Sequence, residues 1–142
     1  MRSSTSGGTE LPYVDSSFWI AQAMQSDDRA ADASRLAELH GEKPLVTSRL
    51  VEGETWSFLR RREGHAHAMQ WLDRVRAAAR CRVEPVTREV EDEAWAWLRV
   101  HDERPYSFVD ATSFALMRRL GIREALAFDG DFAAAGFVEL RP

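Results

Sequence analysis

The sequence contains little cysteine, almost no lysine and no long apolar run. Its single cysteine, Cys81, cannot form an internal disulfide, which excludes a disulfide-stapled scaffold. No segment approaches the roughly 18 consecutive apolar residues that a membrane span needs. The opening "MRSSTSGGTE" lacks the apolar stretch of a signal peptide. We therefore expect a cytoplasmic protein that has no membrane partner.

An excess of positive charge is also missing. The formal net charge is −4, which argues against a protein whose whole surface neutralises nucleic-acid phosphates but leaves room for a local basic patch. Lys43 is the only lysine among 19 basic residues, so the cations are nearly all guanidinium groups, which suit bidentate contacts to phosphate or carboxylate. Genome base composition explains the same bias equally well.

What is present fits one domain of ordinary size. The chain has 142 residues, of which 44% are hydrophobic and 30% charged, and this composition is typical of a globular protein with a sizeable core. Residues 1–10 are rich in Ser, Thr and Gly and lack periodicity, so we interpret them as a flexible leader. Residues 11–142 are then expected to form a single domain.

Strand-length apolar runs alternate with longer helical patterns along the chain. The runs span 11–14, 44–47, 81–86, 124–128 and 137–140. The helical patterns span 18–24, 29–40, 49–62, 66–79, 89–101 and 108–121. This alternation indicates βαβ units, and it predicts an α/β fold: a three-layer α/β/α sandwich with a four- or five-stranded, mostly parallel sheet.

Two carboxylates follow predicted strands. Asp15 comes after "PYV" and Asp129 after "ALAF", and in an open α/β sheet ligands bind beyond the carboxyl ends of the strands. Each acid has a structural alternative. Asp15 can cap a helix that begins at Ser16 or Ser17. Asp129 can form an Asp-Gly turn with Gly130.

A third acid lies within the helix expected over 48–62. The i, i+4 spacing aligns Glu54 with Leu50 and Phe58, so we expect Glu54 on the apolar face. An acid there needs a partner because burial of an unpaired carboxylate is costly, and this leaves either a functional site or a structural salt bridge. Glu52 falls roughly on the opposite side and is interpreted as an ordinary solvated acid.

A fourth acid, Asp110, begins another predicted helix. The segment "SFVD" from Ser107 matches a capping box, but a helix that starts at the same rim would also aim this carboxylate into the crevice. Acids that converge from four separate segments repel one another unless a cation lies among them. Hard oxygen ligands favour Mg²⁺ or Mn²⁺.

Four segments together resemble the ordered motifs of a PIN-domain ribonuclease, in particular a VapC-type toxin. They are "VDSSFW", "TSRLVEGETWSFLRRR", "YSFVDATSFALMRRLGI" and "ALAFDGDFAAAGF". The similarity runs from about Val14 to Phe137. It implies a metal-dependent endoribonuclease whose four acidic positions are Asp15, Glu54, Asp110 and Asp129.

The resemblance also implies roles for individual residues. Asp15 and Asp129 would bind Mg²⁺ or Mn²⁺ directly. Glu54 and Asp110 would bind it directly or through water and would orient the attacking water. Ser16 and Ser113 occupy positions where a hydroxyl supports the acids, and Asp131 is an additional, weaker candidate. Hydrolysis would leave a 3′-hydroxyl and a 5′-phosphate.

Two other functions fit part of the sequence. The segment "FDGDF" shares a DxD pattern with haloacid dehalogenase-type phosphatases, which are also metal-dependent phosphate-ester hydrolases, but that family needs the motif after its first strand. The other possibility is a non-catalytic domain of the same fold that binds protein or RNA. The presence of all four acids weighs against it.

The family resemblance implies an RNA substrate, a VapB-like antitoxin and a homodimer. The expected antitoxin surface is a groove between the helices around 18–39 and the pair over 48–79, where Trp19, Trp56 and Trp71 would be anchors. A core role for these tryptophans is the alternative. Arg60–Arg62 end the helix that carries Glu54, where they complement the helix dipole or contact phosphate.

Overall fold

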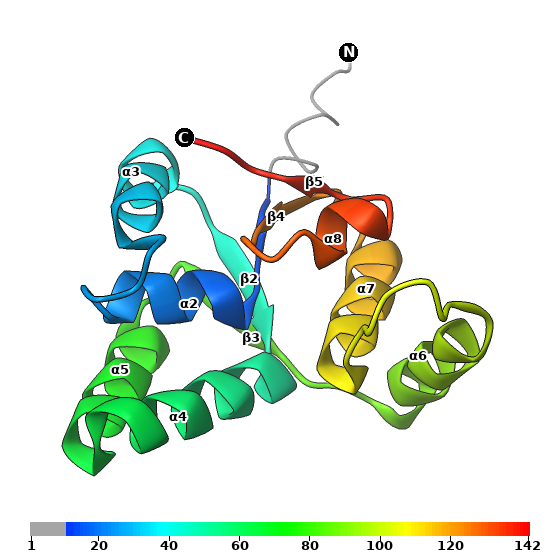
Figure 1. Cartoon of the computed structure of the whole chain (residues 1–142), viewed down its shortest axis with the longest axis horizontal. Helices are drawn as coiled ribbons and strands as arrows, with labels where there is room; N and C mark the ends of the chain where they lie inside the picture. The colour runs from blue at the N-terminus through cyan, green and yellow to red at the C-terminus, as the bar shows by residue number, and fades with distance from the viewer. Residues whose placement is uncertain (1–10) are drawn as a thin grey trace.

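The computed structural model describes residues 11–142, so the predicted leader over 1–10 lies outside the described residues. Figure 1 shows a central sheet with helices on both of its faces. Within residues 11–142 the sheet has five strands in the order β3-β2-β1-β4-β5, and each neighbouring pair is parallel. The predicted three-layer α/β/α sandwich is therefore confirmed, with a fully parallel sheet.

The strands are short and the helices long. The strands are β1 (Tyr13–Val14), β2 (Leu45–Ser48), β3 (Cys81–Glu84), β4 (Glu124–Leu126) and β5 (Val138–Glu139). The helices are α2 (Ser16–Ala23), α3 (Ala30–His40), α4 (Arg49–Glu63), α5 (His65–Ala77), α6 (Arg88–Val100), α7 (Phe108–Leu120) and α8 (Asp131–Ala134). In Figure 1, α2 to α5 lie on one side of the sheet and α6 to α8 on the other.

Local signals in the sequence set several helix ends. Asp15 is the N-cap of α2, where its side chain accepts a hydrogen bond from the Ser17 backbone N–H. Ser107 and Asp110 form a complete capping box at the start of α7. Gly121 ends α7 in the left-handed conformation, with φ at 71°, which is easily accessible to glycine. These caps confirm the structural interpretations of Asp15 and Asp110 without excluding a further role.

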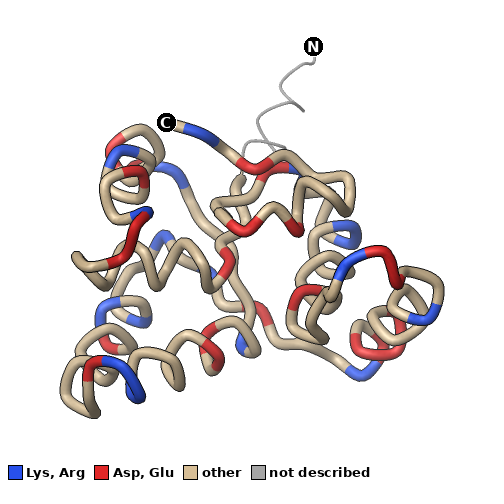
Figure 2. The backbone as a smooth tube through the Cα atoms, viewed as in Figure 1, with Lys and Arg blue, Asp and Glu red and all other residues tan. Residues whose placement is uncertain are grey.

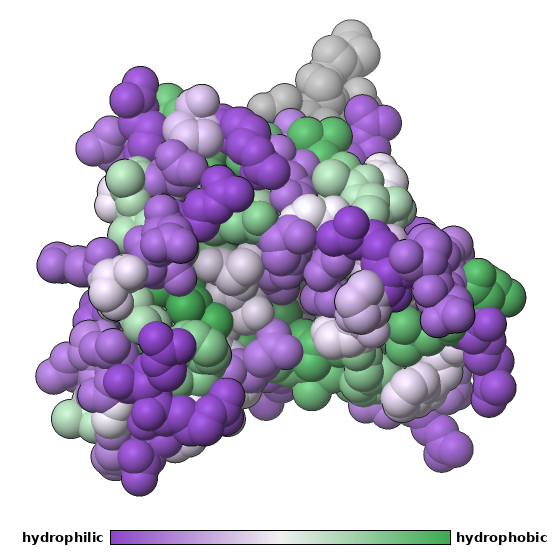
Figure 3. All heavy atoms as spheres, in the orientation of Figure 1, coloured by the Kyte–Doolittle hydropathy of each residue, from purple (hydrophilic) through white to green (hydrophobic). Residues whose placement is uncertain are grey.

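The core lies on both faces of the sheet, and α7 is its most enclosed helix, since every residue from Asp110 to Met117 is buried. Trp19 and Trp71 are also core residues, 6% and 3% exposed, with ring centroids 6.0 Å apart. Trp56 is half-buried against the core. Figure 3 shows that the face seen in Figure 1 is mostly hydrophilic, with hydrophobic side chains reaching it between the helices. Within residues 11–142, no helix is both long and apolar enough to cross a bilayer.

Candidate metal centre

The sheet changes its direction of growth between β1 and β4. From β1 the chain adds β2 and β3 on one side, and then returns to add β4 and β5 on the other. In open α/β sheets the crevice at this switch point, beyond the carboxyl ends of the strands, is where ligands bind. Asp15 directly follows β1 and donates its backbone N–H to the Leu126 carbonyl at the end of β4. Asp129 lies three residues further along the chain than Leu126, so both acids lie at this crevice.

Asp15 is almost completely buried, with 1% of its surface exposed. Its Oδ2 accepts hydrogen bonds from the Ser17 hydroxyl at 2.8 Å and the Ser17 backbone N–H at 3.2 Å. Its Oδ1 is buried and has no hydrogen-bond partner among the described residues. Burial, and then the charge of Asp129, raise the pKa of Asp15 to about 7, against the opposing effect of Ser17. The unpaired oxygen therefore needs a proton or a cation.

Asp110 enters the crevice from the first turn of α7. It is buried, and its Oδ2 accepts the Ser107 backbone N–H at 3.1 Å while its own N–H donates to the Ser107 hydroxyl at 2.9 Å. Burial raises the pKa of Asp110 to about 6, and the charges of Asp129 and Asp131 add to this effect. The capping box thus fixes a carboxylate at the crevice while satisfying the helix end.

Asp129 and Asp131 lie on one tight turn that leads into α8. Asp129 Oδ1 accepts the Asp131 backbone N–H at 3.1 Å, and Gly130 between them adopts φ 83°. Desolvation raises the pKa of Asp129, and the charges of Asp131 and Glu139 raise it further. One carboxylate oxygen from each of Asp110, Asp129 and Asp131 lies within 4.8 Å of the other two. This acid cluster has the size of a single cation site.

Glu54 does not lie on a buried face of its helix, contrary to the prediction from the sequence. It is exposed, and Glu52 is the buried acid at 7% exposure, so the predicted positions of these two residues are wrong. The buried side of α4 carries Val51, Glu52 and Thr55, because the packing of α4 turns that stripe toward the protein. Glu52 is the one with the structural salt bridge, to Arg76, with contacts of 3.1 and 3.3 Å.

Glu54 nevertheless lies near Asp15. Its Oε1 accepts a hydrogen bond of 2.7 Å from the Ser16 hydroxyl, the residue next to Asp15 in the chain. The Ser16 hydroxyl therefore contacts one of the candidate acids, Glu54, directly. Ser113 does so less directly, because its hydroxyl is 2.7 Å from the buried Tyr13 hydroxyl, on the strand that leads to Asp15.

Two residues at the site were missed from the sequence. Ser17, the second residue of α2, bonds Asp15 and also accepts the Phe128 backbone N–H at 3.0 Å. A hydroxyl two residues after an N-capping Asp is the signal that would have indicated it. Arg104 forms an ion pair with Asp131 at 2.8 Å, and the sequence carries no local signal for this contact. Asp131 itself lies more centrally than expected, as a member of the acid cluster.

The donor set fits a hard divalent cation. Figure 2 shows acidic segments after β1, before α8 and in the first part of α7 grouped around the middle of the molecule. All of the donors are carboxylate oxygens, which is the chemistry that Mg²⁺ and Mn²⁺ prefer. The unpartnered Oδ1 of Asp15, together with the raised pKa values of Asp15 and Asp110, agrees with a site that binds a cation.

Comparison with known families agrees with this geometry. A family model for the PIN domain matches residues 13–138. The chain belongs to the PIN-domain family. This PIN domain is 53% identical over 132 residues to "23S rRNA-specific endonuclease VapC20" from two strains of Mycobacterium tuberculosis, a match that covers 92% of this chain and 98% of each relative.

A solved structure gives the same result. The crystal structure of M. tuberculosis VapC20, described as a "Sarcin-Ricin loop cleaving toxin", superposes with a TM-score of 0.85 at 52% identity and covers 92% of this chain and 98% of the other. The interpretation of the sequence as a VapC-type endoribonuclease is thereby confirmed. PIN nucleases use divalent metal ions, in agreement with the acid cluster. The phosphatase alternative has no support, since the DxD segment follows β4 and not the first strand.

Proposed function

We propose that this PIN-domain protein cleaves 23S rRNA within the sarcin-ricin loop, as the toxin of a toxin–antitoxin pair. The observation that carries the hydrolytic part is the acid cluster of Asp110, Asp129 and Asp131 beside the unpartnered Asp15 oxygen. The substrate is inferred from relatives that are 53% identical over almost their whole length and named for this RNA. The cytoplasm, where ribosomes are made, is the proposed location.

Asp15, Asp110 and Asp129 would hold Mg²⁺ or Mn²⁺, and Glu54 would bind it directly or through water. When bound, the ion supplies Lewis-acid polarisation of the scissile phosphate and lowers the pKa of an attacking water. Asp15 is fixed for this task by Ser17, and Asp110 by its capping box with Ser107. Neither carboxylate has to reorganise before it can bind a cation.

We further propose that Glu54 orients the attacking water. Ser16 donates to Oε1 at 2.7 Å, which leaves Oε2 free of hydrogen bonds among the described residues. The side chain is exposed, so water and substrate can reach it. We propose that Oε2 accepts a proton from the attacking water. The water oxygen would form a bond to phosphorus as the bond between phosphorus and the 3′ oxygen breaks, and the 3′ oxygen would take up a proton from solvent, which leaves a 3′-hydroxyl and a 5′-phosphate.

A VapB-like antitoxin is the proposed partner, and a cavity of about 400 Å³ between α2, α3 and α5 is its proposed docking site. Trp19, Leu36 and Trp71 contribute its apolar lining, and the exposed Arg74 and Arg80 border it. An antitoxin helix with apolar anchors and acidic flanking residues fits this surface. The prediction of a homodimer also belongs to this proposal. Co-expression with the neighbouring small reading frame, followed by purification and size determination, tests both the antitoxin complex and the homodimer.

The decisive experiment for the function is site-specific cleavage of ribosomal RNA. Purified protein is incubated with ribosomes in Mg²⁺ or Mn²⁺, and primer extension maps the 5′ ends. We expect one cut in the sarcin-ricin loop, abolished by a chelator. Asp15→Asn should lower the rate about 100-fold or more, since several kcal/mol of charge stabilisation are lost. Asn is as good an N-cap as Asp, so α2 is preserved.

Asp92→Asn is the matched control, because Asp92 is an exposed acid on α6 and the substitution removes the same charge. It should cleave at the wild-type rate. Cleavage by Asp15→Asn at the wild-type rate would show that Asp15 is not a required ligand. Cuts distributed over many rRNA sites would contradict the proposed substrate.

A further inference from the structure

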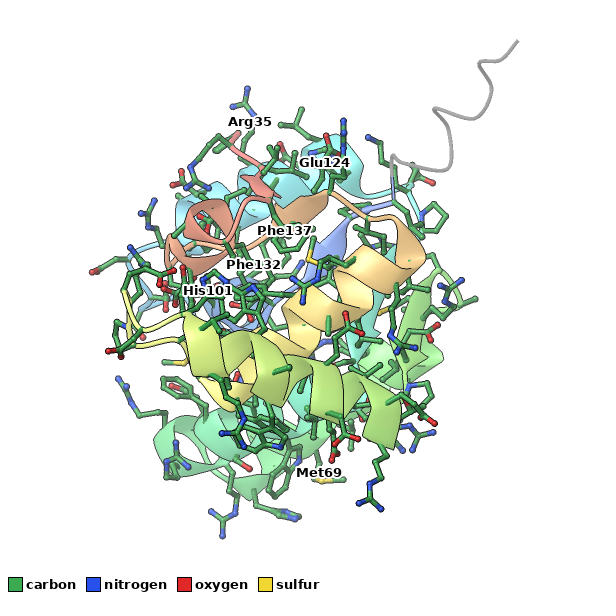
Figure 4. The ribbon with its side chains drawn as sticks, turned by 90° about the vertical axis from the view of Figure 1, so that its right-hand side faces the viewer. Arg35, Met69, His101, Glu124, Phe132 and Phe137 are labelled. Carbon is green, nitrogen blue, oxygen red and sulfur yellow. The ribbon has the colours of Figure 1, made fainter. Side chains whose placement is uncertain are left out.

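Arg104, on the loop between α6 and α7, lies against the acid cluster. Its Nε and Nη2 atoms are 2.9 and 2.8 Å from the same oxygen of Asp131, and Nη2 also donates to the Asp129 carbonyl at 3.4 Å. All of these contacts are with the turn that carries two acids of the cluster. In Figure 4, His101, which caps α6, lies on the same side of the molecule as Phe132 of α8.

The loop that carries Arg104 is held on both sides of this residue. Before it, the His101 ring stacks on Trp97 with centroids 4.0 Å apart, and His101 pairs with Glu103 at 3.1 Å. After it, the Tyr106 backbone N–H donates to the Arg104 carbonyl at 2.8 Å. The guanidinium is therefore presented to the cluster by an anchored loop.

The Arg104 guanidinium has donors that remain available. A guanidinium carries five N–H donors, and Nη1 has no hydrogen-bond partner among residues 11–142. The side chain is 40% exposed. A Cβ at Gly130 would lie 3.4 Å from Nη2, so the absence of a side chain there leaves room for the guanidinium. Two N–H groups can thus bind a ligand that approaches the cluster from solvent.

The charge of the acid cluster indicates which ligand the free N–H groups of Arg104 bind. The acid cluster carries three negative charges when ionised, Asp15 beside it adds a fourth, and one divalent cation neutralises only two of them. An RNA phosphate that approached a cluster with the ion alone would still be repelled. Arg104 supplies a further positive charge at the cluster. Guanidinium groups recognise phosphate oxygens through paired N–H donors.

We propose that Arg104 binds the RNA substrate, donating from Nη1 to a phosphate next to the scissile bond. Asp131 is its positioning residue, and it holds the guanidinium instead of serving as an essential ligand of the ion. The inference rests on the proposed function, since it needs RNA as the substrate.

The test compares Arg104→Gln with Arg119→Gln. Arg119 is an equally ion-paired arginine at the other end of α7, 2.8 Å from Glu93. For a sarcin-ricin RNA oligonucleotide, Arg104→Gln should lower kcat/KM about 10- to 100-fold, mainly through KM, as expected for lost charge-assisted hydrogen bonds. The slope of log kcat/KM against log salt should become shallower by about 0.7. Arg119→Gln should change neither value.

Two further measurements separate substrate binding from organisation of the metal site. Mn²⁺ titration of RNA-free protein, followed by electron paramagnetic resonance, should give Arg104→Gln an affinity equal to or tighter than wild type. Arg104→Lys should have the salt dependence of the wild type, because a lysine keeps the positive charge. Its KM should lie between the values of Arg104→Gln and the wild type, because a lysine lacks the paired donors.

Each contrary outcome is distinct. Weaker Mn²⁺ binding by Arg104→Gln would assign the arginine to the metal site and overturn the inference. Kinetics of Arg104→Gln that match those of Arg119→Gln would overturn it as well, while leaving the nuclease function intact. A wild-type protein that cleaves no RNA would refute the proposed function, and the inference with it.

Discussion

Ser17 donates two hydrogen bonds to one carboxylate oxygen of Asp15, from its hydroxyl at 2.8 Å and from its backbone N–H at 3.2 Å. The same hydroxyl accepts the Phe128 backbone N–H at 3.0 Å. One small side chain thus joins the end of the central strand β1 to the segment that follows β4, and leaves the other Asp15 oxygen free for a cation.

Ser17→Ala should destabilise the protein by about 1–3 kcal/mol, because it leaves the Phe128 N–H unpaired and removes a donor from a buried carboxylate. It should also weaken Mn²⁺ binding, since the orientation of Asp15 is lost. Urea denaturation and Mn²⁺ titration measure the two effects. Ser57→Ala, at an exposed position on α4, should stay within about 0.5 kcal/mol of wild type. An equal effect of both substitutions would contradict the bridging role.

The stability of the metal-free protein should fall as pH rises from about 4 to 7. The pKa of Asp15 is raised to about 7 and that of Asp110 to about 6, whereas an unfolded Asp loses its proton near pH 3.9. Across this window the folded state binds more protons than the unfolded state, so the free energy of unfolding decreases with pH.

Asp15→Asn isolates the Asp15 part of this effect. In the presence of a chelator at pH 8, the variant should be more stable than wild type by on the order of 4 kcal/mol. The difference should shrink toward pH 4.5. Urea denaturation at several pH values measures it, and a constant difference would rule out an abnormal Asp15 pKa. Mn²⁺ affinity of the wild type should show the opposite trend and increase with pH, because the ion competes with the same protons.

Glu52 and Glu54 lie two residues apart on α4. Substitution of the first should change stability, and substitution of the second should change activity. Glu52→Gln should cost about 1–2 kcal/mol of stability, since it weakens a charge-assisted contact of a buried carboxylate with Arg76. Its rate of RNA cleavage should remain close to wild type. Glu54→Gln should leave stability within about 0.5 kcal/mol but lower the cleavage rate at least tenfold. The reverse pattern would show that the exposed acid is not the functional one.

Glu139 should stabilise the turn that carries Asp129 and Asp131. Its Oε2 accepts the backbone N–H groups of Phe132 and Ala133, both at 3.1 Å, at the start of α8. Glu139→Gln should cost about 1–3 kcal/mol of stability and weaken Mn²⁺ binding. Glu38→Gln, at an exposed position on α3, is the control. Unchanged Mn²⁺ affinity in Glu139→Gln would show that the turn holds its shape without this carboxylate.

The sequence alone was sufficient to predict the parallel sheet and six of the seven helices found within residues 11–142; the four-residue α8 was not predicted, and the four acidic site positions stay a prediction. Strand-length runs and helical patterns reflect local periodicity, so the parallel α/β sandwich followed from them and is observed. Asp15 and the Ser107–Asp110 pair act as caps within one helical turn, and these structural roles were visible in the chain. The predicted burial of Glu54 was wrong, because the side chain is exposed, and its contact with the residue next to Asp15, through Ser16, was not foreseen.

The sequence by itself determined the elements of this protein and the acids that end its strands, because caps and periodic patterns depend on neighbours a few residues away. Only the tertiary structure decided which side of α4 is buried, and therefore that Glu52 pairs with Arg76 while the exposed Glu54 accepts a hydrogen bond from Ser16. It also decided that Arg104 contacts Asp131. The rotation of a helix against a sheet and the approach of a loop to a distant turn result from packing among segments far apart in the chain, and no local pattern encodes them.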